Sequence, residues 1–499
     1  MSDLKTVLRN LGGIFIIIGL VTLIALLVPL LSPSTPYDCV GPILITAALY
    51  FGFGLPLYYG FKNAEPANFK SAMVTAALGW LFISIIGSIP FWLIPYDGIL
   101  FMDPLSAFFE SMSGWTGTGL TMVGGAEANL PPVLQFWRTI IQWIGGVGVI
   151  VLTLSILARP GTGSFVLYKG EAREQKTHPS IISTVRTIWW IFLLYTIIGI
   201  FVVWIVGFFD SGGGMSFWES INHAMTGLAT GGFSVTSDSL ASFGNLSQIA
   251  ILVLMVIGAI AFAAHYDLLK GRIRKFFSDA QLKAIVALII LGVIALTLAN
   301  LNLPGINGNL WHSLKVSGFQ FTSAITCTGF ANTNIIGWGE GSKLILSFAM
   351  IIGGAAGSTA GGIKLFRAIL LYKGVGWRIK RAISTPRRVF VHKLGEKSLS
   401  KEDAMDLINE AAIISFMWVI LLLIGIFVTL AAEGNTLSNT VFEVCSAQGN
   451  VGLTAGVTSM NMEPVTKVML ILNMWIGRLE IIPIIVLVKS MFGIKRNIL

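Results

Sequence analysis

Four polar runs centred on glycine interrupt long apolar stretches of this 499-residue sequence. They lie at 114–121, 230–234, 326–330 and 449–454, and each follows a short helix-like segment. Non-helical backbone is tolerated at membrane depth only where it is buried in protein or lines a water-filled cavity. Carbonyl oxygens from four such loops around one axis can replace the hydration shell of a small cation, because glycine lets them turn inward without a Cβ clash. With no ring of carboxylates after the glycines, the pattern predicts a pore for a dehydrated monovalent cation.

The four runs belong to an internal repeat. The copies align on Gly119, Gly232, Gly329 and Gly452. Six residues upstream stand Ser113, Thr226, Ser323 and Ser446, and the next apolar segment carries Gly145, Gly258, Gly353 and Gly477 in an Ile-Gly pair. One glycine in a polar run usually marks only a turn, but four matched copies indicate a repeated unit. The unit is an outer helix, a re-entrant pore helix with its loop, and an inner helix.

Ten apolar segments surround these runs, and each is long enough to cross a bilayer. Their positions are 13–32, 40–61, 71–96, 133–158, 187–208, 247–266, 284–302, 343–372, 407–432 and 464–490. A chain that is 55% hydrophobic and 11% charged is not a soluble globular protein. The sequence predicts an all-α polytopic membrane protein with two extra N-terminal transmembrane helices before four pseudosymmetric repeats. The expected divisions are 1–70 for this extension and 71–183, 184–276, 277–400 and 401–499 for the pore repeats.

The net charge of +9 has a topological pattern. Most of the 33 Lys and Arg fall in alternate connections between the predicted spans, and the other connections carry mostly acids. The positive-inside rule therefore predicts that both termini are cytoplasmic. This distribution accounts for the positive net charge, so a nucleic-acid partner is not needed to explain it. Three isolated cysteines and five scattered histidines indicate neither a disulfide framework nor a metal centre.

One inner segment has a composition that disfavours a helix. The run 353–362 holds five glycines and two hydroxyl residues, and each glycine costs about 1 kcal/mol relative to alanine in a helix. We expect the helix to break there, below the four loops, where a loop obstructs the cavity. The alternative is close packing of an intact helix through Gly353 and Gly357, which are spaced as in a Gly-x-x-x-Gly pair.

Arg478 stands where the other inner segments carry Gly146, Ala259 and Gly354. An arginine near the centre of a membrane helix costs roughly 2.5–3.5 kcal/mol, so it needs water, an acid or carbonyl partners. We interpret it as a positive barrier beside the pore. The alternative is a salt bridge with Glu480, but residues two apart on a helix point to different faces.

Other polar residues of the spans are assigned structural roles. Nine residues before each reference glycine stand Glu110, His223, Gln320 and Glu443, which we expect to brace the pore helix. Three cations in the outer parts of the inner segments, Arg138, Lys343 and Lys467, are expected to snorkel toward the surface.

Four motifs make the chain resemble the Trk/Ktr/HKT superfamily of potassium transporters, most closely its TrkH type. They are Gln142-Trp143-Ile144-Gly145-Gly146-Val147-Gly148, Phe262-Ala263-Ala264-His265-Tyr266, the run 353–364 and Gly477-Arg478-Leu479-Glu480. The resemblance implies potassium uptake across a prokaryotic plasma membrane by a homodimer with one pore per protomer. It also implies control by a cytosolic nucleotide-binding subunit of the TrkA type, with no cofactor tightly bound to this chain, and contact with membrane lipids.

The resemblance also implies site residues. The positions that match the family's selectivity filter are Gly117, Thr118 and Gly119; Thr230, Gly231 and Gly232; Cys327, Thr328 and Gly329; and Asn450, Val451 and Gly452. The positions that match the family's intramembrane gate are Gly353, Gly354, Gly357, Ser358, Thr359, Gly361 and Gly362, and Arg478 is expected beside them. Sodium-passing plant members carry serine at the position of Gly119, so potassium is favoured. Gly117 and Cys327 depart from the more usual threonine, and Gly258-Ala259 departs from a double glycine.

Three alternative functions stay open. A symporter coupling K⁺ to H⁺ or Na⁺ predicts titrating acids within the inner segments, which offer only Glu480. A membrane enzyme requires a paired set of catalytic His, Cys or carboxylate residues, and the sequence offers none suited to that role. A sodium-conducting relative is distinguished by ion competition.

Overall fold

The computed structural model describes residues 2–31, 39–95, 101–148, 181–384, 392–394 and 397–491. Within these ranges the chain is helical except for loops and one short antiparallel pair, β1 (His392–Leu394) with β2 (Lys397–Leu399). Six helices are long and apolar enough to cross a membrane, and the number rises to eight if each of two sharply bent helix pairs counts as one span. The all-α polytopic architecture predicted from the sequence is confirmed.

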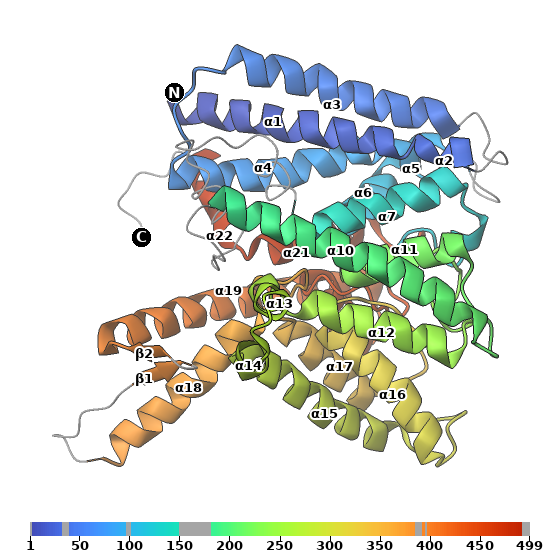
Figure 1. The fold of residues 1–499 in the computed structure, drawn as a ribbon, viewed down its shortest axis with the longest axis vertical. Helices are drawn as coiled ribbons and strands as arrows, with labels where there is room; N and C mark the ends of the chain where they lie inside the picture. The colour runs from blue at the N-terminus through green and yellow to red at the C-terminus, as the bar shows by residue number, and fades with distance from the viewer. Residues whose placement is uncertain are drawn as a thin grey trace.

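The described helices follow one order four times (Figure 1). The outer helices are α4 (Phe69–Gly87), α10 (Ile181–Phe208), α15 (Ala280–Asn300) and α19 (Lys401–Glu433). The pore helices are α6 (Pro104–Thr116), α11 (Phe217–Leu228), α16 (Leu310–Ile325) and α20 (Leu437–Gln448). The inner helices are α7 (Pro132–Val147), α12 (Asn245–Ala259), α17 (Glu340–Ile352) and α21 (Pro464–Leu479). A short helix, α5 (Ile89–Leu93), follows α4 in the first copy.

The N-terminal helices lie at one edge of this arrangement (Figure 1). They are α1 (Ser2–Ile24), α2 (Leu27–Leu31) and α3 (Val40–Gly60). Helices α1 and α2 form one apolar span and α3 the other, so the extension has two spans. Helix α1 packs against α3 and against α4 of the first repeat.

All four pore helices begin at a side-chain N-cap, which satisfies backbone donors that the first helical turn leaves unpaired. The capping residues are Asp103, Ser216, Asn309 and Thr436, which accept from backbone N–H groups of Ser106, Glu219, His312 and Asn439 respectively. Each pore helix ends beside one of the four aligned loops, so the negative end of its dipole faces that loop. Each of these short helices therefore favours a cation at its C-terminal end.

Three of the four inner helices are broken within the described residues, and this corrects two of the predicted spans. The expected break at 353–362 is confirmed, because α17 ends at Ile352 and α18 (Leu365–Ala382) begins at Leu365. The continuous spans 247–266 and 464–490 are wrong. Helix α12 bends by 103° into α13 (Phe262–Leu269), and α21 bends by 112° into α22 (Ile482–Met491). Residues 149–158 of the predicted span 133–158 lie outside the described residues.

Two different causes produce the unexpected bends. At the end of α12, the carbonyls of Gly258 and Ala259 accept hydrogen bonds from Thr359 and Ala355 of a distant loop, at 3.2 and 3.0 Å. At the end of α21, Glu480 and the next residue, Ile481, have left-handed backbone with φ of 54° and 76°. The sequence carries one signal near each bend, Gly258 in the last turn of α12 and Pro483 at the second residue of α22.

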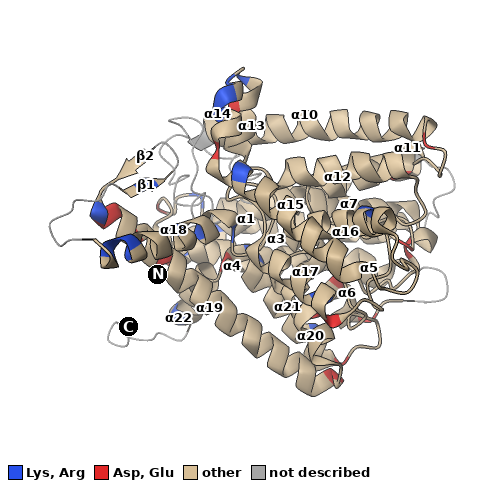
Figure 2. Ribbon diagram, turned by 90° about the horizontal axis from the view of Figure 1, so that it is seen from below, with Lys and Arg blue, Asp and Glu red and all other residues tan. Residues whose placement is uncertain are grey.

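Figure 2 displays the charge asymmetry of the fold. Lys and Arg gather at the end that holds α18, the N-terminus and α14 (Ile273–Ser278). Much of the basic segment predicted between α7 and α10 lies outside the described residues, as do the basic residues at 385–391 and 495–496.

Candidate pore and gate

The structure brings the four aligned loops together in one closed ring. We call 117–119, 230–232, 327–329 and 450–452 the candidate filter loops. Their last residues, Gly119, Gly232, Gly329 and Gly452, all have left-handed φ, of 91°, 75°, 88° and 98°. A Cβ added at each would overlap the carbonyl oxygen of the middle residue in the following loop, which is Gly231, Thr328, Val451 and Thr118 in turn. Each loop therefore touches the next, and the fourth touches the first.

The first residues of these loops are also left-handed, although their side chains differ. Gly117, Thr230, Cys327 and Asn450 have φ of 68°, 51°, 54° and 53°. A residue with a Cβ pays roughly 1–2 kcal/mol for this conformation, so the surrounding structure holds it in place. The departures from threonine at Gly117 and Cys327 therefore keep the left-handed backbone that the other two loops have at this position.

The upstream hydroxyl column anchors the candidate filter loops. Ser113, Ser323 and Ser446 each accept a hydrogen bond from the glycine N–H six residues on, at 3.0, 3.1 and 3.0 Å. Thr226 acts differently, because its hydroxyl donates to the carbonyl of Phe233 at 3.0 Å. The column that aligned in the sequence therefore fixes each loop to its own pore helix.

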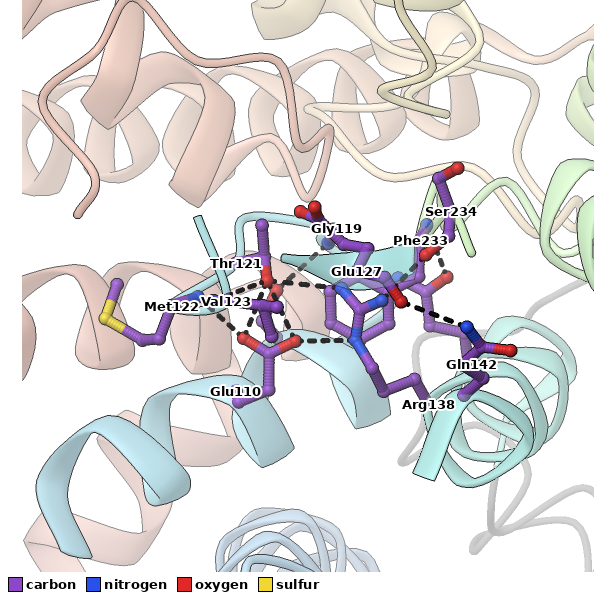
Figure 3. A network of polar contacts seen from close by, with 12 residues as sticks. Glu110, Gly119, Thr121, Met122, Val123, Glu127, Arg138, Gln142, Phe233 and Ser234 are labelled. Carbon is purple, nitrogen blue, oxygen red and sulfur yellow. Dashed lines mark hydrogen bonds and ion pairs between the residues drawn. The ribbon is translucent and has the colours of Figure 1, made fainter. Parts of the chain in front are cut away.

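The column nine residues upstream, predicted to brace the pore helix, joins each pore helix to the segment that follows its candidate filter loop. In the first repeat, Glu110 accepts from the hydroxyl of Thr121 at 3.0 Å and the N–H of Met122 at 2.7 Å (Figure 3). It also forms a 2.8 Å ion pair with Arg138. In the other repeats, His223 bonds to Ser234, Gln320 to Asn332, and Glu443 to Thr454. The two buried carboxylates are thus held by structural donors.

Arg138 does not snorkel, and that expectation is wrong. Its side chain is buried against Glu110, and its guanidinium donates to the carbonyl of Ser234 at 2.7 Å (Figure 3). The guanidinium carbon also lies 4.1 Å from the centre of the Phe233 ring. Since Ser234 and Phe233 follow the second candidate filter loop, this arginine ties the first repeat to the second.

The run after α17 forms a loop that lies against the second repeat. We call 353–364 the candidate gate loop. Its Thr359 hydroxyl donates to the carbonyls of Gly258 at 2.9 Å and Leu228 at 3.2 Å, and it accepts from the hydroxyl of Thr230 at 3.0 Å. The N–H of Phe262 donates to the loop carbonyl of Gly357 at 3.0 Å. Because the run is not helical, helix packing through a Gly-x-x-x-Gly pair does not explain its glycines.

The glycines of this loop allow tight turns and close approach. Gly353, Gly357 and Gly362 have left-handed φ of 71°, 78° and 78°. A Cβ at Gly354 would crowd Ala360 and a Cβ at Gly361 would overlap the carbonyl of Gly449, so these two positions have no space for a side chain. The remaining predicted gate residue, Ser358, bonds within the loop to the carbonyl of Ala355 at 2.6 Å.

Arg478 joins three of the repeats. From the last turn of α21 its guanidinium donates to the loop carbonyl of Thr359 at 3.1 Å. It also donates to the carbonyls of Gly146, at 2.8 Å, and Gly145 in the first repeat. Glu480 instead forms an ion pair with Arg367 at the start of α18. The half-buried positive charge is therefore held by backbone oxygens of the first and third repeats.

Comparison with known proteins identifies the family. The TrkH family of cation transport proteins matches residues 43–493. The chain belongs to the TrkH family. It is 34% identical to an uncharacterised cation transporter of Methanocaldococcus jannaschii, over 98% of this chain and 96% of that protein. It is also 31% identical to the Trk system potassium uptake protein TrkH of Salmonella typhimurium, over 86% and 88%.

A solved TrkH structure has the same fold. The crystal structure of the potassium transporter TrkH from Vibrio parahaemolyticus superimposes with a TM-score of 0.80 at 25% identity, covering 98% of this chain and 99% of that one. Together with the apolar helices, these similarities make the chain a multi-pass membrane transporter of the Trk potassium uptake type.

Two residues of this TrkH-family chain gain roles that the sequence did not indicate. Gln142 donates to the filter-loop carbonyl of Gly231 at 2.6 Å and accepts from the N–H of Phe233 at 2.9 Å. Asn450 of the fourth loop donates to the hydroxyl of Thr118 in the neighbouring first loop at 3.0 Å. A polar residue at 142 was a usable signal, since the equivalent position, three before the inner-helix glycine, is methionine in the other three repeats.

Proposed function

We propose that the chain takes up potassium through a channel-like pore whose selectivity filter is the ring of four candidate filter loops. The observation that carries the proposal is the closed ring, in which each loop glycine lies against a carbonyl of the next loop. Such a ring offers carbonyl oxygens to a dehydrated cation from four sides. Glycine at position 119 favours potassium over sodium, and the names of several relatives specify potassium uptake.

Three acids of the pore and inner helices favour a channel-like pore over an ion-coupled transporter. A symporter needs a carboxylate that is free to bind and release its coupling ion. Glu110 and Glu443 are instead held by donors of their own repeats, and Glu480 is paired with Arg367. Potassium is the transported ion, and no resident cofactor of this chain is required.

We further propose that the candidate gate loop and Arg478 close the pore beneath the filter. The loop extends from the third repeat to the second, and Arg478 connects it to the first. A positive charge below the filter raises the electrostatic barrier to a cation. Opening then requires the loop to release the carbonyls of Gly258 and Ala259, and Arg478 to release Thr359.

Assembly and orientation belong to the same proposal. We assign the basic end of the fold and both termini to the cytoplasm, as the positive-inside rule favours. The chain itself is assigned to the plasma membrane of a prokaryote, where it contacts the lipids. The chain acts as a homodimer, and a cytosolic nucleotide-binding subunit of the TrkA type regulates it. The relatives' assignment to a Trk system supports such a partner. The repeats divide at 71–183, 184–276, 277–400 and 401–499, after the extension at 1–70.

The direct cellular test is rescue of a strain that lacks potassium uptake. We expect the chain, expressed with its cognate regulator, to restore growth at low K⁺. Gly119→Ser is expected to impair the rescue and to increase inhibition by Na⁺, because serine introduces a Cβ against the carbonyl of Gly231. Gly125→Ala, at a glycine whose added Cβ meets nothing within 4 Å, is the matched control for backbone strain. Failure of the expressed wild-type chain to rescue contradicts the proposal.

The closing role of the loop predicts a gain of function. In Thr359→Val the side chain keeps its size but loses the hydrogen bonds to Gly258, Leu228 and Thr230. At a net contribution of about 0.5–1.5 kcal/mol per bond, the loss of even one of these bonds predicts at least a roughly two- to tenfold rise in basal rubidium flux into proteoliposomes without regulator. Ser358→Ala is the control, because Ser358 bonds only within the loop among the contacts found for its hydroxyl. Equal flux in Thr359→Val and wild type contradicts a closing role.

A further inference from the structure

A second ring of contacts joins the repeats on the outer side of the candidate filter loops. Its members stand ten residues before the inner-helix glycine of each repeat: Gln135, Gln248, Lys343 and Lys467. All four are buried, at 5–6% exposure. A buried amide or ammonium group is costly unless it is fully hydrogen-bonded, so its partners reveal what it is for. This burial also corrects the expectation that the two lysines snorkel.

Each member first bonds to the loop that precedes its own inner helix. The acceptors are backbone carbonyls seven or eight residues upstream. Gln135 donates to Glu127 at 3.0 Å, Gln248 to Leu240 at 3.1 Å, Lys343 to Ile336 at 2.7 Å and Lys467 to Met460 at 2.8 Å. The position thus carries the same local role in all four repeats, with either amide or ammonium chemistry.

Each member also bonds to the following repeat. Gln135 accepts from the indole of Trp218 at 2.8 Å, Gln248 accepts from Asn332 at 3.2 Å, Lys343 donates to Asn439 at 2.7 Å, and Lys467 donates to Ser106 at 2.9 Å. Lys467 also lies 3.7 Å from the carboxylate of Asp103. Three of these partners stand in the first turns of pore helices and one stands just after a candidate filter loop. The contacts run from repeat 1 to 2, 2 to 3, 3 to 4 and 4 to 1, so they close a ring.

We propose that Gln135, Gln248, Lys343 and Lys467 are positioning residues that form an outer clamp and hold the filter at the width that selects potassium over sodium. The inference rests on the proposed function. The filter ring and the outer clamp connect the same neighbouring repeats, one at the C-terminal ends of the pore helices and the other near their beginnings. Loosening the clamp lets a pore helix tilt, and a tilt moves the filter carbonyls at its other end.

The repeats themselves supply the matched variants. Lys343→Gln installs the residue that repeats 1 and 2 use at this position. Lys343→Met keeps an unbranched side chain but removes both hydrogen bonds. Asn439→Ala removes the inter-repeat contact while leaving the bond from Lys343 to Ile336 in place. Asn439 is only partly buried, and the contact found for its side chain is the one with Lys343.

The experiment measures reversal potentials of purified full-length protein in planar bilayers with K⁺ on one side and Na⁺ on the other. We expect Lys343→Met and Asn439→Ala each to lower the K⁺ to Na⁺ permeability ratio at least about threefold, and Lys343→Gln to retain it. A purely structural role lowers the yield of folded protein and leaves the ratio of the folded channels unchanged.

The outcomes separate the clamp from the proposed function. If Asn439→Ala keeps the wild-type K⁺ to Na⁺ permeability ratio, the outer clamp is overturned and the proposed function is not. Asn439→Ala alone tests the clamp if Lys343→Met does not fold. Equal loss of selectivity in Lys343→Gln and Lys343→Met also overturns it, because the amide then fails to substitute. A wild-type protein that does not select K⁺ over Na⁺ overturns the proposed function, and the clamp with it.

Discussion

Gly329→Ala is expected to abolish selective potassium uptake, with a fall in K⁺ flux of at least about tenfold. Two physical effects combine. The residue has a φ of 88°, a conformation that costs a side chain with a Cβ about 1–2 kcal/mol. The added methyl group also overlaps the carbonyl oxygen of Val451 and lies against Gly452, so the third and fourth loops must separate. Flux of K⁺ and Na⁺ into proteoliposomes measures both the rate and the selectivity.

Gly337→Ala is the matched control for this substitution. Gly337 follows the same loop, and a Cβ there meets nothing within 4 Å. Its φ is outside the left-handed region. We expect wild-type flux and selectivity from Gly337→Ala. Folded Gly329→Ala protein with wild-type K⁺ flux and selectivity refutes the assignment of these loops as the filter.

Arg478→Ala is expected to raise basal cation flux by at least about tenfold in the absence of the regulator. The substitution removes a positive charge below the filter and also the hydrogen bonds to Thr359, Gly145 and Gly146. A single hydrogen bond to a charged group contributes about 1.5–3 kcal/mol, and each 1.4 kcal/mol is a factor of ten in an equilibrium. The measurement is rubidium uptake into proteoliposomes that contain the chain alone.

Two further variants interpret the result at Arg478. Arg478→Lys keeps the charge but cannot reproduce the guanidinium fork, so we expect an intermediate flux. Arg381→Ala removes an exposed cation at the end of α18 and is expected to leave the flux unchanged. Wild-type basal flux in Arg478→Ala contradicts a barrier at this position and favours a purely structural arginine.

The sequence predicts those parts of the site that are repeated within the chain. The glycines at 119, 232, 329 and 452 and the hydroxyl six residues before each were visible as columns, and the structure gives those columns hydrogen bonds and tight backbone contacts. The run 353–362 was visible because five glycines in one helical segment oppose helix formation. The four-repeat helical fold followed from the same periodicity.

Contacts between distant repeats were not visible in the sequence. The bend after α12 depends on hydrogen bonds from Thr359, about a hundred residues later in the chain. The burial of Arg138, Lys343 and Lys467 depends on acceptors in a neighbouring repeat. Because the sequence does not reveal those acceptors, it predicts that a cation near a helix end snorkels. Residue type predicted which positions were polar, but only the packing of the repeats determined their partners.

The proposed function requires that this chain forms a potassium-selective pore. Single-channel recording of the purified protein, with K⁺ exchanged for Na⁺ on one side, tests it most directly. We expect unitary currents in K⁺ that reverse near the K⁺ equilibrium potential and shrink when Na⁺ replaces K⁺. Ion movement that follows a proton or sodium gradient in a fixed ratio, with no unitary currents, would contradict it.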